Sequence, residues 1–144
     1  MILPDVNVLV RALRSDAPDH ARYRHWLEET ASGPAPFGLA DIVLSGVLRV
    51  LTHPRVFSPP TPSEHVLEEL GRLRALPTCV VVAPGPRHWD LFTRLCRDAG
   101  ARGNLVPDAY LAALAVESGS EWVTTDRDFA RFPGLRWRHP FPPE

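Results

Sequence analysis

The architecture of the chain is set by its opening segment, MILPDVNVLVRAL, residues 1–13. Residues 1–5 are apolar up to Asp5 and predict a strand. Val6–Leu13 predicts a helix that turns Val8 and Leu9 inward, because these apolar side chains recur at helical spacing. An acid therefore stands where a strand passes into a helix, which is a position at the edge of a sheet.

The same alternation of strand and helix continues along the chain. Helices are predicted over Asp19–Thr30, Leu39–Leu51, Ser63–Leu76, Arg87–Ala99 and Pro107–Ser118, with a short helical turn over Asp126–Arg131. Further strands are predicted over Cys79–Ala83, Trp122–Thr124 and Leu135–Trp137, the first of them buried on both faces. We therefore expect one domain over residues 1–144, an α/β fold with three layers (α/β/α) in which helices flank a central parallel sheet of about four to five strands.

Composition excludes several classes of chemistry. All 16 basic residues are Arg, so P-loop nucleotide binding, Schiff-base chemistry and the phosphotransfer designs that rely on Lys have no Lys to use. The net charge is −1, so any nucleic-acid site must be a local patch. The two cysteines, Cys79 and Cys96, match no metal-binding or redox spacing and are interpreted as reduced packing residues.

The sequence also carries expectations about location. Residues 1–5 lack the basic start and the long apolar stretch of a signal peptide, and no run of about 18 apolar residues occurs. We therefore expect a cytoplasmic protein that does not engage a membrane.

Four acids fall where strands end or helices begin: Asp5, Asp108, Asp126 and Asp128. In a parallel sheet they can converge at one edge, where neighbouring carboxylates repel each other unless a hard divalent cation neutralises them. Oxygen ligands favour Mg²⁺ or Mn²⁺, and such a site suits hydrolysis of a phosphodiester by activated water. Helix N-capping by Asp108 and Asp126 is the structural alternative, and both interpretations remain open at this point.

The chain resembles the PIN-domain ribonucleases in several ordered motifs. These are Asp5–Val10 (DVNVLV), Gly103–Ala109 (GNLVPDA) with Leu111–Ala115 (LAALA), and Thr124–Phe129 (TTDRDF). Leu48–Phe57 (LRVLTHPRVF) and Pro133–Trp137 (PGLRW) further resemble VapC toxins of toxin–antitoxin pairs. Each motif is weak alone, but together they cover nearly the whole chain in the right order.

The resemblance implies a Mg²⁺-dependent endoribonuclease, with Mn²⁺ as a substitute, that is restrained by a VapB-type antitoxin and forms a homodimer. It implies an RNA substrate such as transfer RNA or ribosomal RNA. The metal ligands carry over to Asp5 and Asp108, and Asp126 is the further acid that completes the metal pocket. Among the other positions, Asp128 assists through water, while Asn7 and Thr124 orient the acids or the attacking water.

One position departs from the family pattern. Many PIN domains carry a Glu in the helix that corresponds to Leu39–Leu51, where this chain offers Asp41, with Ser45 and Gly46 further along. Asp41 is therefore the substitute candidate, although its side chain is shorter. The alternative function is a catalytically impaired PIN-like module that binds RNA or a protein. A small-molecule phosphatase is disfavoured because the chain has no Lys.

Two surface features allow both a functional and a structural interpretation. Several arginines near the proposed edge are candidates for RNA-phosphate contacts, or they form a solvated face: Arg49, Arg55, Arg11 and Arg127, with Arg14 and Arg131 nearby. The helices Leu39–Leu51 and Ser63–Leu76, joined by a proline-rich connector, form either a clip that holds the antitoxin or ordinary core packing.

Overall fold

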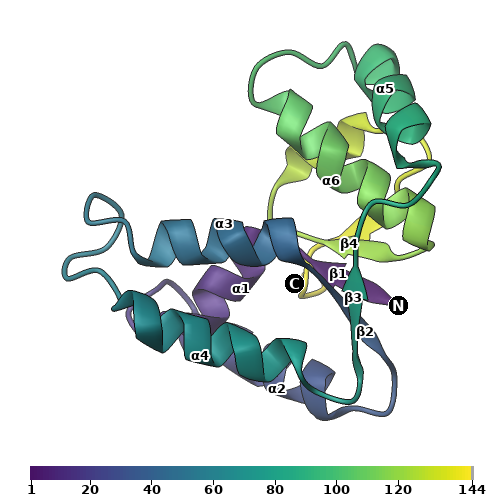
Figure 1. Cartoon of the computed structure of the whole chain (residues 1–144). Helices are drawn as coiled ribbons and strands as arrows, with labels where there is room; N and C mark the ends of the chain where they lie inside the picture. The colour runs from purple at the N-terminus through teal and green to yellow at the C-terminus, as the bar shows by residue number, and fades with distance from the viewer. Residues whose placement is uncertain (144) are drawn as a thin grey trace.

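The computed structural model describes residues 1–143 and has a five-stranded, all-parallel sheet at its centre (Figure 1). The strand order is β3-β2-β1-β4-β5, so the first strand of the chain lies in the middle of the sheet. The strands are β1 (Ile2–Pro4), β2 (Phe37–Ala40), β3 (Cys79–Val82), β4 (Glu121–Val123) and β5 (Trp137–Arg138).

Helices cover the two faces of this sheet. They are α1 (Val6–Leu13), α2 (His20–Ser32), α3 (Asp41–Leu51), α4 (Ser63–Arg74), α5 (His88–Ala99) and α6 (Leu105–Ser118), with the 3₁₀ turn η1 (Arg127–Arg131). In Figure 1, α1 to α4 lie on one side of the strands, and α5 and α6 lie on the other. The chain crosses the sheet in one direction from β1 to β3 and in the opposite direction from β3 to β5, so right-handed crossovers place the two groups on opposite faces. The predicted three-layer α/β/α fold is confirmed.

The pairing of β1 with β4 brings the two halves of the chain together. Leu3 pairs with Trp122 and Pro4 with Val123, and the side chains of Leu3 and Trp122 are fully buried in the core. Beyond the last pair, the backbone N–H of Asp5 donates to the carbonyl of Val123 at 2.9 Å. The side chains that follow β1 and β4 therefore lie next to each other at the carboxyl edge of the sheet.

The strand β2 was not predicted, and the prediction of one helix over Leu39–Leu51 was wrong at its start. Leu39 and Ala40 belong to β2, and the helix begins at Asp41. All four residues of β2 are buried, because α-helices and strands surround it on both faces and both edges. A buried strand this short shows no alternation of apolar and polar residues, so its apolar run merges with the pattern of the following helix.

The prediction that Cys79–Ala83 is buried on both faces was also wrong. This strand, β3, is at the edge of the sheet, and Val80 and Val81 are each 42% exposed. A β-branched run bounded by prolines predicts a strand correctly, but its burial depends on strand order, which the local sequence does not encode.

The helix predicted from Pro107 starts two residues earlier, at Leu105, and Pro107 sits in its first turn, where the missing N–H has no intrahelical acceptor to lose. This helix, α6, is the longest in the described part of the chain at 14 residues. No helix within residues 1–143 has the length and apolar character needed to cross a membrane.

Gly46 lies at a close contact between α3 and α1. A Cβ built on Gly46 would lie 2.8 Å from Cγ2 of Val6, the first residue of α1. A β-branched side chain in a helix has little rotamer freedom with which to move away. Gly71, in α4, has nothing within 4 Å of the corresponding position.

These two glycines predict opposite effects of the same substitution. Gly71→Ala should raise the free energy of unfolding by about 0.5–1 kcal/mol, since Ala is the better helix former and the added methyl group meets no neighbour. Gly46→Ala should give no such gain, because contact with Val6 offsets the helix propensity. Urea denaturation of the two variants measures the difference, and equal stabilisation by both would contradict the tight contact between α1 and α3.

Candidate active site

Asp5 is buried at the carboxyl end of β1, with 6% of its surface exposed. Its Oδ1 accepts from the backbone N–H of Val6 at 2.7 Å, which caps α1. Its Oδ2 accepts from Oγ1 of Thr124 at 2.7 Å and from Nδ2 of Asn7 at 3.2 Å. Burial raises the pKa of Asp5 and the charge of Asp126 adds to the rise, while the three hydrogen bonds oppose it.

Thr124 joins the segments that follow β1 and β4. Besides donating to Asp5, its Oγ1 accepts from Nδ2 of Asn7 at 3.2 Å and from the backbone N–H of Asp126 at 3.1 Å. Asn7 in turn accepts from the backbone N–H of Thr125 at 3.2 Å. The network holds Asn7 and Thr124 against the acids, so the structure brings these two predicted residues to the same place as Asp5 and Asp126.

Asp108 lies in the first turn of α6 and faces the same group of acids. Its pKa is raised to about 6, first by burial and then by the negative charges of Asp126, Asp5 and Asp128. Among residues 1–143 its carboxylate accepts no hydrogen bond. Asp108 therefore lies beside other acids without a hydrogen-bond donor. The charge repulsion lowers the stability of the metal-free protein, and a carboxyl group with such a shifted pKa is typical of a functional position.

The N-capping interpretation holds for one of its two candidates. Oδ1 of Asp126 accepts from the backbone N–H of Asp128 at 2.9 Å and so caps the turn η1. Asp108 makes no capping bond in the described part of the chain. Asp128 is exposed at the rim of the group, where its contribution is to the electrostatics of Asp108.

A cavity of about 420 Å³ opens over these acids. Asp5, Asp108 and Asp126 line it, and its other lining residues are Val6, Asn7, Val10, Arg11, Ala17, Pro18, Val50 and Phe57. The apolar wall was not predicted. Phe57 comes from the connector between α3 and α4, and the guanidinium of Arg14 lies 4.5 Å from its ring centre while donating to Thr61 at 3.1 Å. Only the tertiary position of that connector identifies Phe57 as part of the site.

Asp41, the predicted substitute for the helical Glu, is not brought to the cavity. It begins α3, is exposed, and forms an ion pair with Arg74 of α4 through contacts of 2.8 and 3.2 Å. The guanidinium of Arg74 lowers the pKa of Asp41. The physical reason is helix rotation, because position 46 of α3, a glycine, is the one that faces the start of α1. The helix α3 therefore supplies no carboxylate to the lining.

The predicted phosphate-binding arginines separate into two groups. Arg11 lines the cavity over the acids, and Arg127 lines an adjoining cavity that also includes Thr125. Arg49 lies instead in an apolar cavity between α3 and α6, and Arg55 is exposed on the connector and lines neither of the first two. Of the four, only Arg11 lines the cavity over the acids, while the cavity lined by Arg49 shares Val6 with it.

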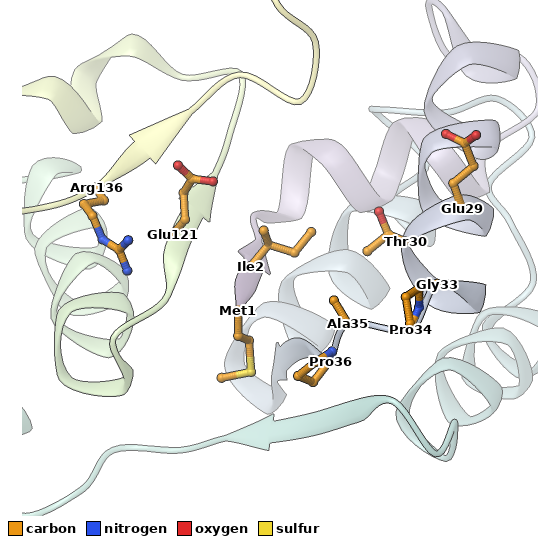
Figure 2. A pocket seen from close by; sticks show the side chains of 10 residues that line it. All are labelled: Met1, Ile2, Glu29, Thr30, Gly33, Pro34, Ala35, Pro36, Glu121 and Arg136. Carbon is orange, nitrogen blue, oxygen red and sulfur yellow. The ribbon is translucent and has the colours of Figure 1, made fainter.

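Another carboxylate-bearing cavity, of about 400 Å³, lies at the amino ends of the strands (Figure 2). Figure 2 shows Glu121 and Arg136 on one side of Met1 and Ile2, with Glu29 on the other. Glu121 is already ion-paired with Arg138 at 2.7 Å. This cavity lies away from the edge where the strands end, so it does not compete with the Asp cluster as the candidate site.

The donor set of the Asp cluster fits a hard divalent cation. Its ligands are carboxylate oxygens, and Asp108 has none of its charge satisfied by a hydrogen bond within residues 1–143. Within that same range no group of three or more His, Cys, Asp or Glu side chains is close enough to hold an ion by itself. Mg²⁺ does not require one, since it usually keeps several waters and takes one or two carboxylates.

Comparison with known proteins agrees with this architecture. A sequence profile of the PIN domain matches residues 2–135. The ribonuclease VapC43 of Mycobacterium tuberculosis is 47% identical over 140 residues, covering 97% of this chain and 95% of the relative. The ribonuclease VapC25 of the same organism is 41% identical, covering 97% of this chain and 99% of the relative.

Among solved structures, VapBC2 from Rickettsia felis, bound to a promoter DNA fragment, has a similar fold. The TM-score is 0.69 at 21% sequence identity, covering 96% of this chain and 98% of that one. The matched profile, the two mycobacterial relatives and the shared fold lead to one conclusion: the chain belongs to the PIN-domain family and, within it, to the VapC group.

Proposed function

We propose that this protein is an endoribonuclease toxin that hydrolyses RNA phosphodiester bonds at the cluster of Asp5, Asp108 and Asp126, with Mg²⁺ or Mn²⁺ as cofactor. The observation that carries the proposal is the convergence of these acids in one cavity at the carboxyl edge of a parallel sheet. The strands β1 and β4 are parallel neighbours, and the connections that follow them lead to β2 on one side and to β5 on the other. Open α/β sheets bind ligands at such a point. The names of the mycobacterial relatives, which are ribonucleases, support the choice of RNA.

Each residue of the cluster has a distinct task in this proposal. Asp5 is fixed by Val6, Thr124 and Asn7, so its carboxylate is held in one orientation before substrate arrives. Asp108 is the acid free to take a new partner. A bound divalent cation supplies activation of water and neutralisation of charge at the phosphoryl group. Asp126 adds negative charge beside both acids, which strengthens the attraction for that cation.

The proposed partner is a VapB-type antitoxin. Support comes from the VapBC2 structure, in which a protein of the same fold is assembled with VapB. The hairpin of α3 and α4 projects from the body of the molecule in Figure 1 and carries exposed apolar side chains at Ile42, Val56 and Leu67. These side chains suit the clip interpretation, although Val66 and Leu70 of α4 also pack into the core. The homodimer and the cytoplasmic location stay predictions.

Substitution of Asp108 tests the activity. Asp108→Asn should lower the rate of RNA cleavage by on the order of 100-fold or more, because the amide cannot supply the negative charge that the site needs. The assay is cleavage of total RNA by protein freed of any co-purified antitoxin, in Mg²⁺ and in EDTA. Asp41→Asn is the matched control, since Asp41 lies outside the cavity, and it should leave cleavage unchanged. Binding of RNA without cleavage by the wild-type protein would favour the alternative binding module.

Metal binding is tested separately from catalysis by thermal unfolding. Millimolar Mg²⁺ should raise the Tm of the wild-type protein, since a ligand at about 100 times its Kd stabilises the folded state by about 2.7 kcal/mol. The increase should disappear in Asp108→Asn and persist in Asp41→Asn. A Tm that does not respond to Mg²⁺ or Mn²⁺ in the wild-type protein would argue against a cation site at the cluster.

The raised pKa of Asp108 predicts how stability depends on pH without metal. With a folded pKa of about 6 and an ordinary unfolded pKa near 4, the folded protein binds more protons between these values, so stability falls as pH rises from about 4 to 6. Asp41, with its lowered pKa, contributes in the opposite sense. The contribution of Asp108 is therefore read from the difference between Asp108→Asn and the wild-type protein. In EDTA, Asp108→Asn should gain Tm relative to wild type as pH rises through 6. A difference in Tm between the two proteins that stays constant with pH would contradict the raised pKa of Asp108.

A further inference from the structure

A second cavity adjoins the catalytic one. It measures about 580 Å³ and lies between α2 and the segment that follows β5. The two cavities share no lining residue, but one short segment borders both, since Asp126 lines the catalytic cavity while its neighbours Thr125 and Arg127 line the second. Because the backbone at Asp126 is extended, successive side chains of this segment point to opposite sides.

Aromatic contacts hold the second cavity in place. The ring of Phe141 packs edge-on against Tyr23 of α2, with 4.9 Å between the ring centres. The guanidinium of Arg22 lies 4.0 Å from the centre of the Phe141 ring. The guanidinium of Arg11, which lines the catalytic cavity, lies 5.4 Å from the centre of the same Tyr23 ring. The buried Tyr23 thus supports the walls of both cavities.

The lining carries positive charge in a protein whose net charge is −1. It includes Arg22, Arg127 and Arg138, and none of its lining residues within 1–143 is a carboxylate. Arg138 is ion-paired with Glu121, whereas Arg22 and Arg127 pair with no carboxylate of residues 1–143. The cavity therefore combines a local positive charge with the rings of Trp137 and Phe141.

We propose that this second cavity is a subsite for one unpaired nucleotide of the RNA strand that is cut at the Asp cluster. The proposal rests on the proposed function. Aromatic rings and guanidinium planes stack on the face of any base, and arginines bind the flanking phosphates. A base inside a duplex cannot present its face to such a pocket, so the nucleotide that occupies it must be unpaired. A cavity of this volume falls in the usual range for small-ligand sites.

The first test measures RNA binding without cleavage. The probe is a fluorescein-labelled 12-nucleotide RNA of random sequence, titrated with the Asp108→Asn protein in EDTA at several salt concentrations. Adding Arg22→Ala and Arg127→Ala should weaken binding and reduce the slope of log K against log [salt] by about 0.7 for each phosphate that the protein no longer neutralises. Arg94→Ala, at an exposed position on α5, is the matched control and should change neither quantity.

The second test locates the base. In the same Asp108→Asn protein, RNA carrying 5-iodouridine should crosslink on irradiation to Trp137 or Phe141, as mapped by mass spectrometry. Unchanged affinity and salt slope in the double arginine variant, or crosslinks only to other segments, would overturn the subsite. Equal arginine-dependent binding of a labelled ten-residue polyglutamate peptide would also overturn it, by assigning the cavity to an acidic protein partner.

A failure of the subsite can be distinguished from a failure of the proposed RNA cleavage. If the wild-type protein cleaves RNA but the arginine and crosslinking results fail, the proposed function stands and the subsite falls. If the wild-type protein does not cleave RNA but the Asp108→Asn protein binds it through Arg22 and Arg127, the subsite stands on its own as an RNA-binding site.

Discussion

The buried carboxylate of Asp5 is the constraint on which the rest of the site depends. A carboxylate removed from water is tolerated only when donors surround it, and a hydrogen bond to a charged group contributes about 1.5–3 kcal/mol. Here the donors come from both halves of the chain, with Val6 and Asn7 on α1 and Thr124 after β4. The same bonds that stabilise Asp5 therefore also fix where the segment 124–128 leaves the sheet, and with it the position of Asp126.

Structural and chemical roles coincide in this cluster. Asp5 caps α1 and Asp126 caps η1, yet both also face the cavity. Helix capping uses one oxygen of each carboxylate, which anchors the side chain and leaves the group's charge directed at its neighbours. Asp108 differs because no bond anchors it in the described part of the chain, and its pKa of about 6 reflects burial together with the repulsion that the two anchored acids impose. Capping and metal binding are thus compatible at this edge.

The order of the helices and of every strand except β2, and the placement of Asp5, Asp108 and Asp126 at their junctions, follows from sequence because periodicity and strand ends are local properties. Features that depend on how elements are turned toward one another do not follow. The exposure of Val80 and Val81 depends on which strand is at the edge. The diversion of Asp41 to Arg74 depends on the rotation of α3. The positions of Phe57 and Phe141 depend on where the connector between α3 and α4 and the segment after β5 fold back, which their own sequences leave undetermined.

The pairing of β1 with β4 also determines at what point during synthesis the site can assemble. Asp5 is synthesised well before Thr124, which donates a hydrogen bond to it, and before Asp126, which stands beside it. Until β4 emerges and inserts beside β1, the central strand has β2 as its only neighbour and the acids lie on unconnected segments. A growing chain on the ribosome therefore carries no assembled Asp cluster until β4 and the residues that follow it, up to Asp126, have been synthesised.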